Sequence, residues 1–232
     1  MDEIAIRDPR PGDADEVEAL ITSHFSEGSA YGVDLGVNDP TYRVLVAVEA
    51  GGDGEGGDAG GDGEDGNPGG DGEDGNPGGD GEDGNPGGNG EDGNPGGDGP
   101  ILGVMALREF EAPTAVAEEM YFFDDPDLLP AAELYGHLEM GYVRDGATGR
   151  GIGSRLLGRL HAIGAERGVD LFLADSWYHG GDDSPEGLFD KHGYETVHRE
   201  PIDRPAAECP KCEGECTCEG ALAVRRAEEG AQ

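Results

Sequence analysis

The chain has 232 residues, of which 52 are acidic and 15 are basic, so its formal net charge is −37 at pH 7. An acid excess of this size excludes the basic surfaces that bind nucleic acid or anionic membranes, and we expect neither partner. The opening residues 1–7 contain no targeting segment and no apolar run is long enough for a membrane span, which predicts a cytoplasmic protein. So acidic a surface is typical of salt-accumulating halophiles, in which the screening length falls to about 3 Å.

The N-terminal part of the sequence predicts a strand, a helix and a β-hairpin, in that order. Residues 4–7 read as a short strand, and the spacing from Asp13 to Glu16 fits a capping box at the start of a helix. The expected apolar face of that helix consists of Val17, Leu20, Ile21, His24 and Phe25. The β-rich runs 42–49 and 101–107 follow on either side of a glycine-rich turn, and therefore predict a hairpin.

The predicted hairpin is interrupted by residues 51–99, which contain 24 Gly, 15 acids, five Asn, four Pro and one Ala. So few apolar side chains cannot offset the entropy cost of ordering, and we expect a disordered acidic loop. Residues 60–95 repeat the unit Gly-Gly-Asp-Gly-Glu-Asp-Gly-Asn-Pro four times, with Asn89 in the last copy. The unit resembles a calcium β-roll, but asparagine occupies the position of the large apolar residue, which argues against a calcium-binding adhesive module.

The C-terminal part of the sequence predicts alternating strands and helices. Residues 138–143 and 169–174 read as strands, and an amphipathic helix lies between them. The apolar face of this helix consists of Ile152, Leu156, Leu157, Leu160 and Ile163. A short helix over 185–192 and strands over about 194–202 and 216–226 complete the pattern. The predicted fold class is therefore mixed α/β, with one sheet of about six or seven strands flanked by helices.

The stretch from Val143 to Ser154 carries the most informative chemistry. A predicted strand runs into several glycines and then into the start of the amphipathic helix. The unpaired amides and the positive end of such a helix attract an anion, typically a phosphate, and glycines let the ligand approach the backbone. The spacing excludes both the dinucleotide Gly-x-Gly-x-x-Gly motif and the P-loop.

Basic residues gather around this turn although the chain is acidic. Residues 144–159 contain four arginines, with Asp145 as the only acid, which gives a net charge of +3. The arginines are Arg144, Arg150, Arg155 and Arg159. A polyanionic ligand would explain such a basic island. The alternative is that these arginines form ion pairs with the acidic residues around them.

From these residues the sequence is identified as resembling the GNAT superfamily of N-acetyltransferases, of halophilic type. A valine followed by Arg150-Gly151-Ile152-Gly153 and a leucine-rich helix resembles the acyl-CoA-binding motif of that family. The opening strand and helix and the segment 188–194 resemble further family elements, in the same order. The resemblance covers roughly residues 1–202 without the repeat. It implies the GNAT fold, with a mixed, mostly antiparallel sheet, and an enzyme that moves an acetyl group from acetyl-CoA to a primary amine by direct attack.

The resemblance also implies where acetyl-CoA binds. The backbone around Val143 and Arg144 would pair with pantetheine, where two parallel strands separate, and the amides from Gly149 to Ser154 would hold the pyrophosphate. The cofactor-binding residues implied in this way are Val143, Arg144, Thr148, Gly149, Arg150, Gly151, Ile152, Gly153 and Ser154.

Three positions depart from the family's pattern. Thr148 stands where the family usually has arginine or glutamine, and Asp182 aligns with its common asparagine. Phe189 replaces the frequent tyrosine that protonates the leaving thiolate. Either another group or water supplies that proton, or the protein is a non-catalytic acyl-CoA-binding sensor.

The strand before the turn offers two candidates for a general base. Glu139 is the first choice and His137 the second. Both share parity with Val143, so we expect all three side chains to face one way. The alternatives are a solvated Glu139 and a packed His137. Residues 109–135, with Tyr121 and the nearby acids, are expected to shape an acceptor pocket that favours a cationic amine.

All four cysteines, Cys209, Cys212, Cys216 and Cys218, lie between the last two predicted strands. Cys-Pro-Lys-Cys is typical of zinc knuckles, and four thiolates could complete a tetrahedral site. We expect a structural zinc that pins a hairpin tip, with free thiols and a redox or other-metal role as the alternatives. The expected organisation is a GNAT-like domain over 1–208, interrupted by 51–99, and then the cysteine-rich tip 209–218 before the last strand.

Overall fold

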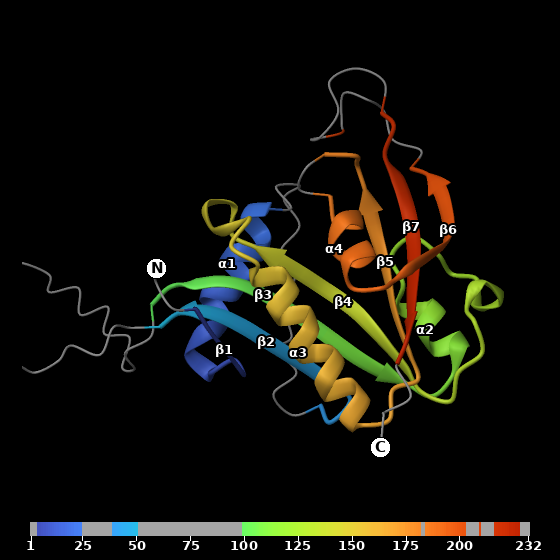
Figure 1. The fold of residues 1–232 in the computed structure, drawn as a ribbon, viewed down its shortest axis with the longest axis horizontal. Coiled ribbons are helices and arrows are strands. Elements are labelled where there is room, and N and C mark those ends of the chain that lie inside the picture. Colours follow the sequence, from blue (N-terminus) through green and yellow to red (C-terminus); the bar gives the residue numbers. More distant parts are fainter. Residues whose placement is uncertain are drawn as a thin grey trace, which may run out of the picture. The chain divides into compact units, whose positions relative to one another are not determined.

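Seven strands form one sheet in the part of the chain that the structure describes (Figure 1). The structure is a computed structural model and describes residues 4–24, 39–50, 99–181, 184–202, 209 and 216–227. The strands are β1 (Ile4–Arg7), β2 (Tyr42–Glu49), β3 (Ile101–Phe110), β4 (Tyr135–Val143), β5 (Leu171–Tyr178), β6 (Glu195–Pro201) and β7 (Glu219–Arg226). Their order is β1-β2-β3-β4-β5-β7-β6, and only β4 and β5 pair in parallel. The predicted mixed, mostly antiparallel sheet is therefore confirmed.

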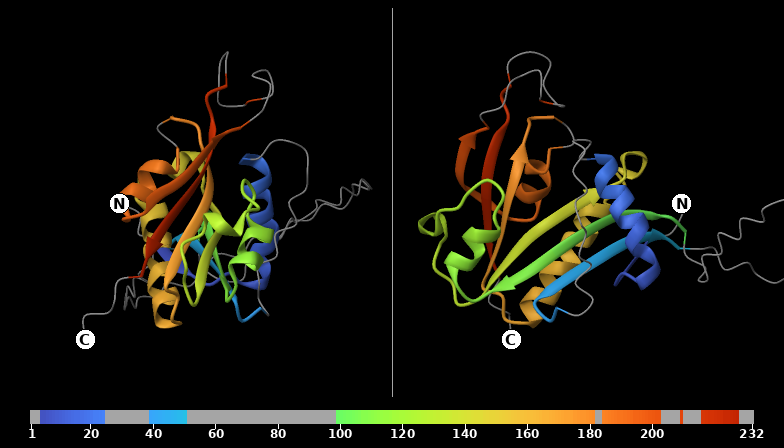
Figure 2. Two further views of the ribbon diagram at one scale, coloured as in Figure 1. Left: turned by 90° about the vertical axis from the view of Figure 1, so that its right-hand side faces the viewer. Right: turned by 180° about the vertical axis from the view of Figure 1, so that it is seen from behind.

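Helices cover both faces of this sheet. The helices are α1 (Ala14–His24), α2 (Pro113–Glu119), α3 (Ile152–Glu166) and α4 (Glu186–Lys191), and the 3-10 turns are η1 (Pro11–Asp13), η2 (Pro126–Leu128) and η3 (Asp145–Ala147). Figure 2 shows α1 and α2 on one face and α3 and α4 on the other. Among the described residues, no helix has both the length and the apolar character needed to cross a membrane.

The core has two layers because the central strands are buried on both faces. α1 packs Val17, Leu20 and Ile21 against β2 and β3 on one side. On the other side, the leucines of α3 pack against the opposite face of the same strands. Runs of consecutive apolar residues such as 44–48 follow from this double burial, because alternate side chains enter different layers.

The hairpin of β2 and β3 brackets the interruption, as the sequence predicted. Tyr42 pairs with Arg108 at one end of the ladder, and the Gly99 amide donates to the Glu49 carbonyl at 2.9 Å at the other. The chain divides into two units, residues 1–51 with 98–232 and residues 52–97. The second unit, with the repeat and its expected disorder, lies outside the described residues.

The segment between β3 and β4, which the sequence left without a clear assignment, contains α2 and η2. α2 buries Val116 and Ala117 in a third apolar cluster, together with Leu173 of β5 and Leu222 of β7. β7 lies between β5 and β6 in the sheet, so the last strand is part of the same folded unit. The segment after α2 is therefore held close to β5, where the candidate site begins.

Candidate functional site

The two parallel strands at the centre of the sheet pair over only three residues. Tyr135, Gly136 and His137 of β4 are opposite residues 171–173 of β5. Beyond this point β4 pairs only with β3, β5 pairs only with β7, and the two strands diverge (Figure 1). Within the part of the chain that the structure describes, the facing backbone edges of residues 138–143 and 174–178 thus have no strand partner. An extended ligand that carries amide groups can bond to such edges.

β4 leads through η3 into the N-terminus of α3, which is built to accept an anion. Gly149 and Gly151 both have φ +75°, a conformation that only glycine adopts without strain. The N-cap residue Gly151 has no side chain that could cap α3, and the first turn of the helix contains no acid. A Cβ atom added at either glycine would meet nothing within 4 Å, so the backbone borders open space. The first amides of a helix have no partner within it, and here they are open to a ligand.

The arginines around this turn are partly neutralised. Arg144 contacts Glu16 at 3.1 Å and Arg150 contacts Glu49 at 3.3 Å. Arg155 donates to a β1 carbonyl at 2.6 Å. The ion-pair alternative therefore holds for two of the four arginines. Both of these pairs are substantially exposed, so a polyanion can compete for their cations at modest cost.

A further cation comes from a helix distant in sequence. Lys191, at the end of α4, places its Nζ 3.3 Å from the Ser154 hydroxyl in the first turn of α3. The sequence analysis assigned no role to Lys191, although it is one of only two lysines in the chain. Thr148 is exposed, and its hydroxyl donates to the Asp145 carbonyl at 2.9 Å.

Glu139 occupies a β-bulge in β4. The β4 partners of two consecutive β3 residues, Ala106 and Leu107, are not consecutive, because the pairing skips Glu139. A bulge adds one residue to a strand and re-aims its side chain, and bulges are common beside active sites. This bulge lies two residues beyond the last pair that joins β4 to β5.

The bulge makes one expectation about side-chain direction wrong. His137 pairs with Arg108 and Val143 pairs with Gly103, and these β3 partners are an odd number of residues apart. An odd separation places His137 and Val143 on opposite faces of the sheet. Val143 accordingly packs with the α3 cluster, whereas Glu139 and His137 face α1 and α2. The extra residue reverses the alternation that the sequence parity assumed.

Charged groups surround Glu139 on this face. One Oε of Glu139 lies 3.4 Å from Arg108, which also approaches Glu119 at 3.6 Å and Asp39 at 3.7 Å. The Glu139 side chain is 19% exposed. Burial raises its pKa above the usual value, while His137 and Arg108 oppose the shift. A partly accessible carboxylate with a raised pKa is suited to accept a proton near neutral pH.

His137 forms a buried pair with an acid that the sequence analysis missed. Its Nε2 lies 2.8 Å from Asp175 Oδ1, and both side chains are under 5% exposed. The other Asp175 oxygen accepts from the Tyr121 and Phe122 amides. Burial opposes ionisation of Asp175, but the hydrogen bond and charge of His137, with both amides, lower its pKa overall. The only feature of the sequence that could have indicated Asp175 is its position as an acid directly after the predicted apolar strand 169–174.

The position of the family's tyrosine is filled by a packed ring. Phe189 is buried in α4, with its ring centroid 5.1 Å from that of Tyr194. The Tyr194 hydroxyl lies 2.8 Å from His161 Nε2, and burial lowers the pKa of His161 to about 3. Burial raises the pKa of Tyr194, so this pair stays neutral. Asp182 lies outside the described residues.

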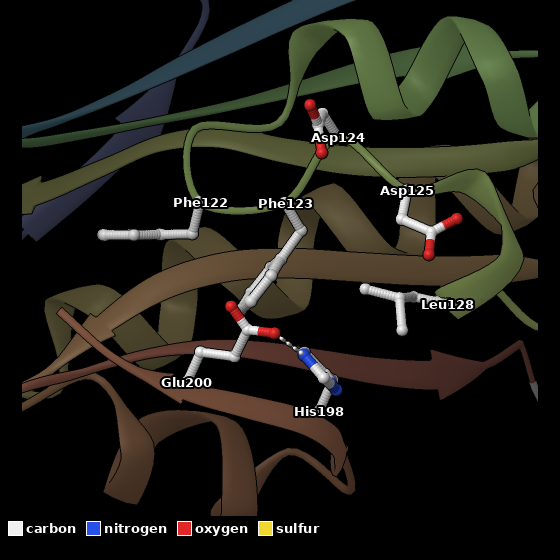
Figure 3. A pocket seen from close by; sticks show the side chains of 7 residues that line it. All are labelled: Phe122, Phe123, Asp124, Asp125, Leu128, His198 and Glu200. Carbon is white, nitrogen blue, oxygen red and sulfur yellow. Dashed lines mark hydrogen bonds and ion pairs between the residues drawn. The ribbon is translucent and has the colours of Figure 1, made fainter. Parts of the chain in front are cut away.

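An acidic pocket of about 230 Å³ lies between the segment after α2 and strand β6 (Figure 3). Its lining consists of Phe122, Phe123, Asp124, Asp125, Leu128, His198 and Glu200. His198 and Glu200 form an ion pair at 3.0 Å. The Phe122 amide links this wall to Asp175, and through it to the strand of Glu139. Three carboxylates around one pocket favour a cationic ligand.

Three of the four cysteines come together just before β7. The Sγ atoms of Cys209, Cys216 and Cys218 all lie within 4.8 Å of one another. Cys212 lies outside the described residues. Cys218 directly precedes β7.

No protein-family model matches the sequence, and no curated protein sequence matches it. Solved structures do match. Arabidopsis thaliana NAA60 in complex with a bisubstrate analogue has a TM-score of 0.55 and 12% identity, over 97% of this chain and 98% of that one. An aminoglycoside 6'-N-acetyltransferase complexed with coenzyme A has a TM-score of 0.53 and 12% identity, over 99% of both chains.

A third solved structure names the family. An acetyltransferase of the GNAT family from Staphylococcus aureus Mu50 has a TM-score of 0.51 and 11% identity, over 97% of this chain and 100% of that one. At such identities the similarity establishes the fold. The chain therefore has the fold of the GNAT-family acetyltransferases, as the resemblance of its sequence implied.

Proposed function

We propose that this chain, which has the fold of the GNAT-family acetyltransferases, is an N-acetyltransferase that moves an acetyl group from acetyl-CoA to a primary amine. One observation carries the proposal. β4 leaves its parallel partner after His137 and then continues directly into the uncapped N-terminus of α3. An unpaired strand edge and an anion-binding helix end thus lie in succession along one segment. Solved proteins of this fold bind coenzyme A and a bisubstrate analogue, which supports the same use here.

The order of the strand edge and the helix end along the chain matches the order of the pantetheine arm and the pyrophosphate in acetyl-CoA. The free edge of β4 near Val143 and Arg144 bonds the amides of the pantetheine arm. The amides from Gly149 to Ser154 hold the pyrophosphate, and Lys191 adds a cation beside Ser154. From residue 143 back to Glu139 the strand spans about 13 Å. The arm, laid along this edge, brings the thioester to the bulge.

The chemistry at the bulge is a direct transfer. The amine nitrogen attacks the thioester carbonyl carbon, the new C–N bond forms, and the C–S bond breaks. Glu139 takes one proton from the charged amine before it attacks, a role that its raised pKa favours. The second proton, which the nitrogen loses as the amide forms, passes through water to the departing thiolate, because Phe189 has no proton to give. The His137–Asp175 pair holds the wall beside the amine through the Tyr121 and Phe122 amides.

The acceptor that fits this face is a cationic amine. Glu119 stands beside Arg108 near the bulge, and Asp124, Asp125 and Glu200 line the pocket beyond it. These acids attract an amine in its charged form and guide it toward Glu139. The proposed catalytic domain covers 1–208 with the interruption at 51–99, and the last strand completes its sheet.

Calorimetric titration of acetyl-CoA in concentrated potassium chloride tests the cofactor site. Gly151→Asp places a carboxylate at the proposed pyrophosphate site and should weaken binding at least about tenfold. Gly168→Asp is the matched control: it makes the same change at an exposed glycine that also has a positive φ, just beyond the other end of α3. It should bind within about twofold of the unchanged chain. No binding by the unchanged chain, or equal loss in both variants, contradicts the proposal.

A non-catalytic acyl-CoA sensor is the second candidate, and the packed phenylalanine at 189 is the observation that favours it. The two functions differ in one readout, the release of free coenzyme A thiol when cationic amines are added. The enzyme releases thiol with at least one amine, and Glu139→Gln slows that release with little effect on acetyl-CoA affinity. A sensor binds acetyl-CoA with the same affinity but releases no thiol with any amine.

A further inference from the structure

The cysteine cluster lies at the end of the sheet where β5 and β6 end and β7 begins. Cys218 directly precedes β7, and its carbonyl accepts a 3.0 Å hydrogen bond from the Ile202 amide just after β6. Glu219, the first residue of β7, pairs with Tyr178, the last residue of β5. Figure 1 shows these three strand ends at the same edge of the sheet. The cluster therefore sits where it can tie the β6–β7 connection to the sheet.

The sulfur geometry fits metal ligands rather than a disulfide. The Sγ atoms of Cys209 and Cys218 are 3.7 Å apart. A disulfide requires about 2.05 Å. In a tetrahedral site with metal–sulfur distances of about 2.3 Å, two sulfurs are separated by about 3.8 Å. The Sγ of Cys216 also lies within 4.8 Å of both, so the three atoms can share one ion.

Burial gives a second, independent reason for a ligand here. Cys209 and Cys218 are buried, and Cys216 is half-buried. The cysteines lie in or beside the connection between β6 and β7. Residues 203–218 of this connection contain only a few apolar side chains besides the cysteines. Convergence of three thiols in such a segment needs an attraction stronger than apolar packing, and a bound metal ion supplies it.

We propose that Cys209, Cys216 and Cys218 bind a structural zinc ion as thiolates. Soft thiolate ligands at tetrahedral spacing select zinc or iron among common metals, and a closed site with no redox task favours zinc. Each thiol loses its proton when it binds, so binding weakens as the pH falls. The ion joins the start of β7 to the segment that follows β6. This proposal does not depend on the acetyltransferase function.

Metal analysis tests the site, on full-length protein purified without a metal-affinity tag. The expected result is about one zinc per chain. Cys209→Ser and Cys216→Ser should each lower the zinc content to a small fraction of that value. Glu219→Gln is the control, because this acid adjoins Cys218 and contacts Arg199 at 3.5 Å without belonging to the cluster. It should retain the full zinc content.

Cobalt substitution and Cys212→Ser complete the test. Cobalt in a tetrahedral thiolate site gives intense visible bands and a sulfur-to-metal charge-transfer band, whereas carboxylate sites give neither. Loss of zinc in Cys212→Ser identifies the fourth ligand, and retention of zinc leaves the three-cysteine site as proposed. Far-UV circular dichroism and a cooperative urea transition show that each variant is folded. Zinc far below one per chain, iron in its place, or zinc loss in Glu219→Gln equal to that of the cysteine variants overturns the proposal.

Discussion

Removal of Arg108 should shift the pH at which the proposed transfer reaction begins. Arg108 lies 3.4 Å from Glu139, and it opposes the rise in the pKa of that carboxyl that burial causes. Arg108→Met removes the cation and keeps an apolar stem of similar length. The pKa of Glu139 then rises further, and a base that must be ionised works only at higher pH. The acidic limb of the pH dependence of kcat/KM therefore moves upward.

The distance sets the size of this shift. Two unit charges 3.4 Å apart interact by about 1.2 kcal/mol in water and about 5 kcal/mol at an effective dielectric constant of 20. The Arg108 side chain is 34% exposed, so solvent screening places the effect near the lower value. One pKa unit corresponds to about 1.4 kcal/mol, which predicts a shift of about one unit.

The assay is the pH dependence of thiol release, with whichever cationic amine supports turnover. Arg167→Met is the control, because Arg167 pairs with Glu109, the residue after Arg108, and does not contact Glu139. Its acidic limb should stay in place. Glu139→Gln should lower the plateau rate about 100-fold or more and abolish the limb. An unchanged limb in folded Arg108→Met, or an unchanged rate in Glu139→Gln, would refute the assignment of Glu139 as the base.

Two further predictions concern α3. Lys191→Met should weaken acetyl-CoA binding several-fold in calorimetric titration, because the Lys191 amine lies 3.3 Å from the Ser154 hydroxyl at the proposed pyrophosphate site. The loss should be larger at low salt, where charges are less screened. Equal affinity of Lys191→Met and the unchanged chain at all salt concentrations would contradict this role. His161 has a pKa of about 3 when folded and about 6.5 when unfolded, so the unfolded state binds more protons and stability falls as the pH drops below 6.5. Urea unfolding should show about 2 kcal/mol less stability at pH 5 than at pH 7 from this group, a loss absent in His161→Gln; identical losses in both chains would contradict it.

Much of the fold could be predicted because the signals are local. The 3.6-residue spacing of apolar side chains located α1 and α3, and the β-rich runs at 42–49 and 101–107 located a hairpin. The glycine-rich turn after β4 predicted an open helix end. In the structure, two of these glycines adopt positive φ values that other residues avoid. The segment 109–135 gave no such signal, and its helix was missed.

The class of sheet, the hairpin around the interruption and the open helix end after β4 could therefore be predicted from the sequence, since each depends on residues within about a dozen positions. The tertiary structure alone decided which side chains meet. The bulge at Glu139 depends on how β4 pairs with β3, and it separates Val143 from His137. The pairing of His137 with Asp175 joins two strands. These contacts depend on the register of β4 against β3 and on the position of β4 beside β5 in the sheet, and no local spacing in the sequence encodes either.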